Sequence, residues 1–194
     1  SYNTIVQYNM KRGELVQKIL YTLLVSGAIL VILSTPSGTR RLLKQLPREL
    51  KKYRRARLLR TLDRLRAQNN VEYIKEEDGK IIIRATENGR DYLKRIDFDN
   101  LSLKRPDVWD KKWRLVIFDI PEKKKIAREA LRNKLKDMGF KKLQHSIWAT
   151  PFPCEKEINL VKLIFNLSDW WLDVIITKNI GKREYQFKKY FNLI

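Results

Sequence analysis

The chain has 194 residues, with 42 Lys and Arg side chains against 22 Asp and Glu, which gives a formal net charge of +20. Hydrophobic residues make up 43% of the sequence, which is enough for a packed core and excludes a wholly disordered chain. The length allows one large domain or two small ones. So large an excess of positive charge points to acidic partners, of which nucleic acid and anionic membrane surfaces are the usual ones.

Cysteine and histidine are each present once, and these counts exclude some kinds of covalent cross-link and metal site. Cys154 alone excludes an intrachain disulfide and suits a reducing compartment, so we expect a cytoplasmic protein. His145 alone excludes a metal site built from several histidines. No serine lies in the glycine pattern of a nucleophile elbow, so a hydrolytic triad is not expected.

The first predicted element is a long apolar helix over residues 13–33. Its core, Ile19–Leu33, is nearly all apolar but shorter than the ~20 residues that span a bilayer. A secretory signal is an alternative, because Lys11 and Arg12 precede the apolar stretch, but no Ala-x-Ala cleavage pattern follows it. We therefore favour a buried core helix over a membrane segment and expect no membrane partner.

Positive charge is concentrated in one part of the first half. The segment Arg40–Arg66 contains twelve basic and two acidic side chains, so it alone carries +10. A short helix is expected over 39–46, and leucines at helical spacing predict a longer one over 48–68.

The helix over 48–68 is the candidate DNA-recognition helix. Its leucines form one stripe, and Arg57, Arg60 and Arg64 fall on the opposite face at roughly 100° per residue. A helix fits the major groove of DNA, where arginines contact phosphates or guanine edges. The alternative is a solvated basic face that binds nothing. The candidate DNA-binding residues are Arg40, Arg41, Lys44, Lys51, Lys52, Arg54, Arg57, Arg60 and Arg64.

A hairpin and a further helix complete the first predicted domain. Strands are expected at Val71–Ile74 and Ile81–Ala85, joined by a turn that contains Asp-Gly, and Thr86 is expected to cap the helix that follows. The order helix, helix, helix, hairpin, helix is that of a winged helix-turn-helix. Residues 1–95 are therefore predicted to be a winged helix-turn-helix DNA-binding domain. The turn at 76–78 is acidic, so we expect the wing to contribute little to DNA binding.

The second half predicts a linker and a small α/β domain, so the chain as a whole is expected to be α+β. Weak periodicity and mixed charge over 96–112 indicate the linker, and the second domain with a C-terminal tail is placed at 113–194. Its βαβαβ-type run has room for an undetected strand and predicts a ferredoxin-like fold. Strands are expected at Trp113–Ile120, Lys142–Thr150 and Trp170–Lys178, and helices at Glu122–Met138 and Glu155–Leu167. The predicted buried face of the first helix is Ile126, Ala127, Ala130, Leu131 and Leu135.

A specific motif lies in the second half. Asp119 ends the first strand in the run VIFDIPE, and after one helix come Gly139-Phe140 and then LQHSIW, which ends at Trp148. This pattern resembles the CRISPR-associated Cas-two family and, more closely, the Cas-two-like central domain of PaaX-type transcriptional repressors. Those repressors carry a winged helix ahead of that domain, so the resemblance covers about residues 14–180. It implies a homodimer that binds duplex DNA as a transcriptional regulator.

Asp119 is the position at which the resemblance implies chemistry. Some Cas-two proteins are metal-dependent endonucleases and others are structural subunits of the spacer-integration machinery, and the catalytic carboxylate of that family maps onto Asp119. Two such residues, one from each subunit, would share a Mg²⁺ or Mn²⁺ ion, which prefers carboxylate oxygens and can activate water. The residues themselves favour another role, in which Asp119 caps the turn at Ile120-Pro121. A nuclease therefore remains the alternative to a regulator, and no other cofactor is implied.

Two further sets of side chains, four tryptophans and a run of three lysines, each have two possible roles. The tryptophans of the second half are expected to pack in a core or an interface rather than stack on bases. Lys123–Lys125 open a helix, where the macrodipole disfavours cations, which indicates an external anion or a solvated face. The tryptophans concerned are Trp113, Trp148, Trp170 and Trp171.

Overall fold

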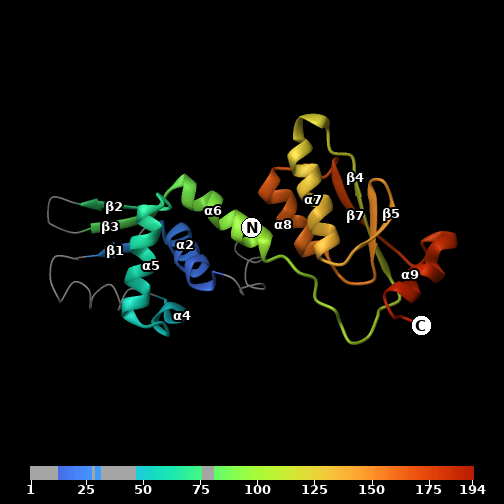
Figure 1. Ribbon diagram of the computed structural model, residues 1–194, viewed down its shortest axis with the longest axis horizontal. Coiled ribbons are helices and arrows are strands. Elements are labelled where there is room, and N and C mark those ends of the chain that lie inside the picture. The colour runs from blue at the N-terminus through green and yellow to red at the C-terminus, as the bar shows by residue number, and fades with distance from the viewer. Residues whose placement is uncertain (1–12, 28, 32–46, 76–80) are drawn as a thin grey trace. The chain divides into compact units, whose positions relative to one another are not determined.

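The computed structural model describes residues 13–27, 29–31, 47–75 and 81–194 (Figure 1). Two compact units divide the chain, a first unit within Met10–Asn100 and a second unit within Leu101–Ile194. In these described ranges the first unit holds a three-stranded sheet and the second a four-stranded sheet. None of the helices in these ranges is both long enough and apolar enough to cross a membrane.

The apolar stretch at 13–33 forms a helix and a strand, so the prediction of one long helix is wrong. Helix α2 covers Glu14–Ser26, and strand β1 covers Ile29–Val31. Gly27 separates them with a φ of 75°, a backbone conformation that side-chain-bearing residues rarely adopt. Strand β1 pairs antiparallel with the strand at 81–85. Because the residues of both elements are apolar, hydrophobicity alone does not distinguish the helix from the strand.

The basic region is also divided differently from the prediction. The expected helix over 39–46 lies outside the described residues, and the expected helix over 48–68 is two helices, α4 at Arg48–Lys51 and α5 at Arg55–Ala67. Arg54, which precedes α5, has an extended ψ of 133°. Like charges at helical spacing destabilise a continuous helix, and four basic residues crowd into 51–55.

The hairpin strands and the capped helix are confirmed. Strands β2 (Val71–Lys75) and β3 (Ile81–Ala85) pair antiparallel in a sheet of order β1-β3-β2. Thr86 caps helix α6 (Glu87–Asp99), because its Oγ1 accepts a 3.0 Å hydrogen bond from the Gly89 N–H. Helix α6 continues four residues into the predicted linker, because its last turns are buried in the first unit.

The second unit has the βαββαβ order of a ferredoxin-like fold, with its strands in the order β5-β6-β4-β7 and all neighbours antiparallel. The segment predicted as one strand at 142–150 is a hairpin that turns at His145-Ser146, which supplies the undetected strand. Its elements are β4 (Trp113–Phe118), η2 (Glu122–Lys124), α7 (Lys125–Asp137), β5 (Lys141–Gln144), β6 (Ile147–Thr150), α8 (Glu155–Phe165), β7 (Leu172–Thr177), η3 (Gly181–Arg183) and α9 (Glu184–Tyr190).

The sheet of the second unit is covered by helices on both faces. Helix α7 packs on the face of Phe118, over whose ring the Arg132 guanidinium lies at 5.8 Å. The opposite face carries Trp113, against which α9 packs through Phe187 and Phe191, with ring centroids 6.1 and 6.0 Å away. Helix α9 was not predicted, although two phenylalanines four residues apart are a signal for a helix with one buried side.

The prediction that Ile126 lies on the buried face of α7 is wrong. Ile126 is 85% exposed, whereas Ala127, Leu131 and Leu135 are buried together with Lys134. These buried positions recur at spacings of three and four residues, and Ile126 lies about 100° away from Ala127 around the helix. The apolar character of Ile126 is therefore not a sign of burial.

Candidate nucleic-acid interface and the Asp119 position

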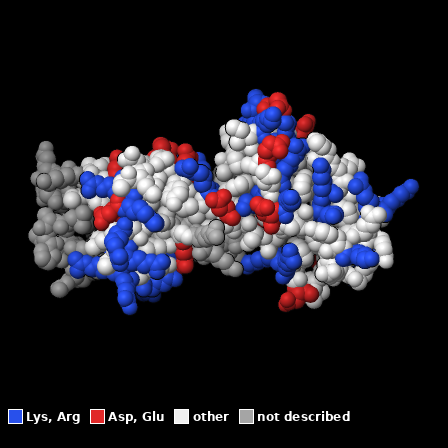
Figure 2. Space-filling view, viewed as in Figure 1, with Lys and Arg blue, Asp and Glu red and all other residues white. Residues whose placement is uncertain are grey.

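Helix α5 has one apolar side and one basic side. Leu58, Leu62 and Leu65 are buried in the core of the first unit. Figure 2 shows Lys and Arg side chains gathered over the part of the first unit where α4 and α5 lie. The basic side chains that α5 exposes are Arg55, Arg57, Arg60, Arg64 and Arg66. The predicted division of this helix into two faces is thus observed.

The central arginines of this surface have no acidic partner in the described part of the chain. No Asp or Glu carboxylate there lies within 4.0 Å of the guanidinium of Arg57, Arg60 or Arg64, whereas other cations of the unit are paired. The Arg57 guanidinium lies 5.5 Å from the Tyr53 ring centroid, and Arg60 donates through Nε to the Ala56 carbonyl at 3.2 Å. The terminal nitrogens of Arg60 remain available as donors, and the charge of the surface is not neutralised within it.

The C-terminal end of α5 is fixed against the start of α6. The Asn70 N–H donates to the Leu65 carbonyl at 2.8 Å, and Asn88 Nδ2 donates to Asn70 Oδ1 and to the Gln68 carbonyl, both at 3.0 Å. A Cβ on Gly89 would lie 2.0 Å from the Asn70 carbonyl oxygen, so only glycine fits there. These contacts hold α5 in one orientation, which presents its arginines as a fixed array.

The remaining candidate DNA-binding residues differ in their surroundings. Lys52 Nζ lies 3.6 Å from Glu14 Oε1 and 5.4 Å from the Tyr53 ring centroid, so this cation is engaged with α2. The hydrogen bond from Lys18 to the same carboxyl is the main reason why the pKa of Glu14 is lowered. Lys51 and Arg54 are exposed beside α5. The predicted residues Arg40, Arg41 and Lys44 lie outside the described residues.

Asp119 is exposed immediately after β4, and the predicted cap is not observed. Its N–H donates to the Trp171 carbonyl at 2.9 Å, but its carboxylate has no hydrogen-bond or ion-pair partner among the residues that the structure describes. The turn is held by another carboxyl, because Glu122 binds Arg128 at 2.6 Å and Arg128 donates to the Ile120 carbonyl at 3.3 Å. The Asp119 carboxylate is therefore free to face solvent.

The surroundings of Asp119 do not fit a divalent cation within one subunit. Mg²⁺ takes about six oxygen ligands, of which proteins usually supply one or two carboxylates, while water and substrate phosphates supply the others. Over the described ranges, no group of three or more His, Cys, Asp or Glu side chains is placed to hold a metal ion. Within one subunit Asp119 offers a single carboxylate, and the shared site that the resemblance implies would need the Asp119 of a second subunit.

The lysines at the start of α7 and the tryptophans are placed as follows. Lys124 donates through Nζ to the carbonyls of Phe165 (3.0 Å) and Asn166 (2.7 Å), where α8 ends. This contact suits the negative end of the α8 dipole, so Lys124 stabilises the fold rather than awaiting an external anion. Trp113 and Trp148 are buried as expected, whereas Trp170 is 94% exposed.

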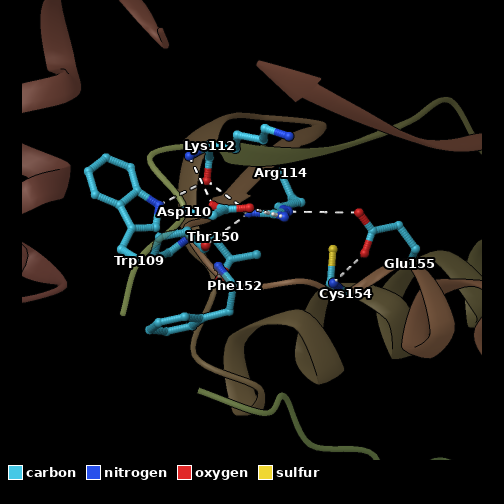
Figure 3. Close-up of polar contacts among 9 residues, drawn as sticks. Trp109, Asp110, Lys112, Arg114, Thr150, Phe152, Cys154 and Glu155 are labelled. Atoms are coloured by element: carbon cyan, nitrogen blue, oxygen red, sulfur yellow. Dashed lines mark hydrogen bonds and ion pairs between the residues drawn. The ribbon is translucent and has the colours of Figure 1, made fainter. Parts of the chain in front are cut away.

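A buried arginine at the start of β4 was missed by the sequence reasoning (Figure 3). The Arg114 side chain, 7% exposed, donates to both carboxylate oxygens of Asp110 at 2.8 and 2.6 Å and to the Pro151 carbonyl at 3.2 Å. Glu155 lies 3.8 Å away from Arg114 Nε and also accepts from the Cys154 N–H at 2.9 Å. The hydrogen bond from Arg114 lowers the pKa of Asp110. The cluster joins β4 to the segment before α8 and is structural.

The topology of the second unit defines a ferredoxin-like domain, and a comparison with protein families identifies its kind. Residues 106–186 match the family model described as the PaaX protein central Cas2-like domain. The match covers most of the second unit and begins within the segment predicted to be a linker. No curated protein matches the chain. The second unit therefore contains a Cas2-like domain of the type found in the centre of PaaX proteins.

Proposed function

We propose that this chain is a cytoplasmic, dimeric transcriptional regulator of the PaaX type. In this proposal the first unit is a winged helix that binds duplex DNA through α5, and the Cas2-like domain forms the dimer. The observation that carries the proposal is the basic side of α5, where Arg57, Arg60 and Arg64 are exposed and have no carboxylate within 4.0 Å among the described residues. The match to the PaaX central domain supports the regulatory role.

The element order of the first unit supports a winged helix. Strand β1 follows α2, and α4 and α5 precede the hairpin β2-β3, with β1 added beside β3 in the sheet. In helix-turn-helix proteins the second helix of the motif enters the major groove and the first crosses the backbone. Helix α5 occupies the place of that second helix, immediately before the hairpin. Its buried leucines face the core, so its arginines are the side that DNA would meet.

The charge of this segment is suited to phosphate binding. Arg48–Arg66 contains nine basic and two acidic side chains. Each phosphate that such a surface neutralises releases counterions, so that log K falls by about 0.9 per contact for each unit of log salt concentration. A solvated basic face without a ligand would show no such dependence, because it would bind no duplex at all.

The test is a titration of labelled duplex DNA, followed by fluorescence anisotropy at several salt concentrations. Replacing Arg57, Arg60 and Arg64 by alanine is expected to reduce the affinity at least ~10-fold and to lower the salt slope by roughly 2–3. The matched control replaces three basic residues of α6, and it is expected to change little. Equal effects of both triple variants would contradict α5 as the DNA-binding helix. The control residues are Arg90, Lys94 and Arg95.

Dimerisation is tested independently of DNA. Light scattering after size exclusion is expected to give twice the chain mass of 23.3 kDa at micromolar concentration. A monomer throughout this range would contradict the dimeric part of the proposal and leave the DNA-binding part standing.

A further inference from the structure

The second unit pairs its cations with acidic side chains on the side of α7 and α8. Several arginines and lysines in or beside these two helices form ion pairs with carboxylates. Both helices also carry acidic residues among the basic ones. An interleaved pattern of this kind is typical of a solvated helical surface. The pairs are Arg128 with Glu122 (2.6 Å), Arg132 with Glu129 (2.9 Å) and Lys162 with Asp169 (2.8 Å).

The side of the unit that carries α9 has a different charge pattern. Residues 178–189 contain five basic side chains and one acidic side chain, Glu184, which is engaged by Lys188 at 2.7 Å. Within the described chain, no carboxylate lies within 4.0 Å of the charged groups of Lys178, Lys182 or Lys189. Figure 2 shows Lys and Arg side chains without any Asp or Glu on the end of this unit where β5 and α9 lie.

Strand β5 extends this basic surface. It is an edge strand, and its first two residues, Lys141 and Lys142, are exposed. Lys141 Nζ lies 4.4 Å from the ring centroid of Tyr190, so the strand and α9 are in contact. We call the set of exposed cations on this side the α9 surface. Its members are Lys141, Lys178, Lys182, Arg183 and Lys189, whereas Lys142, the next residue of the strand, points to the opposite face of the sheet.

Helix α9 is held firmly enough to present these cations in a fixed arrangement. Phe187 is buried, and it packs with Phe191 on Trp113. The outer side of the same helix exposes Tyr185 and Tyr190 among the lysines. Exposed tyrosines next to lysines offer hydroxyl donors and flat apolar surface together with positive charge, which suits the backbone of nucleic acid.

We propose that the α9 surface is a second contact surface for nucleic acid, binding the phosphates of a duplex without reading its sequence. The inference rests on the proposed function, because it assumes that the protein binds DNA. Cations held close together without counter-charges repel one another, and an external polyanion relieves that repulsion. Lysines on an edge strand also discourage strand pairing between molecules, which accounts for Lys141 and Lys142 but not for the cations of η3 and α9.

The experiment compares two triple lysine-to-glutamine variants of the full chain with the wild type. One changes Lys178, Lys182 and Lys189, and the matched control changes Lys125, Lys136 and Lys156, which are also exposed and lie on α7 and α8. Each variant loses three charges, so net charge alone affects both equally. Anisotropy with labelled duplexes of two unrelated sequences is measured from 50 to 300 mM salt, with circular dichroism as the check on folding.

The α9 variant is expected to bind both duplexes ~10-fold or more weakly than the control and to show a salt slope lower by roughly 2. Equal affinities of the two variants would overturn this inference, while weakened binding by the α5 variant would still support the proposed function. A wild type that binds no duplex at all would overturn both. Binding to anionic vesicles without any binding to DNA would also overturn this inference, because it would identify a membrane surface as the partner.

Discussion

Replacing Gly89 by alanine is expected to destabilise the first unit, although alanine is the better helix former. Gly89 lies in the first turn of α6, where the chain passes closest to the end of α5. An alanine Cβ would lie 2.0 Å from the Asn70 carbonyl oxygen, whereas ordinary contacts between carbon and oxygen begin near ~3.3 Å. The two helix ends must therefore separate by more than ~1 Å.

The balance of free energies can be worked from these contacts. Alanine gains about 1 kcal/mol over glycine in a helix. Separation would break the hydrogen bond from the Thr86 N–H to the Asn70 carbonyl (3.1 Å) and that from Asn88 to Asn70 (3.0 Å), at about 1 kcal/mol each. Overpacking adds about 1–3 kcal/mol. The net loss of unfolding free energy is thus about 2–4 kcal/mol.

The assay is urea unfolding with two signals, because all five tryptophans lie between residues 109 and 171, in the second unit. Tryptophan fluorescence reports the second unit alone, and far-ultraviolet circular dichroism reports both. The Gly89→Ala variant is expected to shift the dichroism transition of the first unit to lower urea and to leave the fluorescence transition unchanged. Arg90→Ala, at the next and exposed position, is the control. A Gly89→Ala variant as stable as the wild type would refute the reasoning.

Three further predictions concern the second unit, with unfolding followed by tryptophan fluorescence. Arg114→Met is expected to cost about 2 kcal/mol, because charge-assisted hydrogen bonds to Asp110 are lost; no change would contradict that role. Since the pKa of Asp110 is lowered from 3.8, its ionised form favours the folded state, so stability is lost as the pH falls through the lowered pKa. Asp110→Asn should make the unfolding free energy depend less on pH in this acid range. An unchanged pH dependence would contradict the role of Asp110. Leu131 of α7 is buried and Ile126 is exposed, so Leu131→Ala is expected to lower the unfolding free energy by about 2–5 kcal/mol and Ile126→Ala by less than about 0.5 kcal/mol. Similar losses for the two variants would contradict the observed packing of α7.

Local patterns in the sequence predicted most of the elements and failed where one apolar run holds two of them. The run at 13–33 is a helix and a strand because a single glycine, Gly27, turns the chain, whereas the prediction places this glycine inside one long helix. The run at 142–150 is a hairpin because a two-residue turn at His145-Ser146 interrupts it without glycine or proline. Both cases depend on pairing with strands distant in sequence, which periodicity does not record.

The candidate site was also predictable only where local spacing determines which side chains are exposed. The exposure of Arg57, Arg60 and Arg64 followed from helical spacing alone, because the buried leucines fix the opposite face. The contacts of Lys124 and Arg114 could not be predicted from local patterns, because their most distant hydrogen-bond partners lie 42 and 37 residues away in the sequence. A lone arginine in an otherwise apolar strand was the available signal for the second case.

The central claim, that DNA meets the basic side of α5, is tested most directly by nuclear magnetic resonance of the arginine side chains. The Nε–H resonances of Arg57, Arg60 and Arg64 are assigned by substitution and followed while duplex DNA is added and salt is then raised. DNA contact at the basic side of α5 predicts that all three resonances shift on addition of DNA and return at high salt, while the resonance of Arg90 on α6 stays unchanged. Duplex binding that leaves the three α5 resonances in place would contradict it.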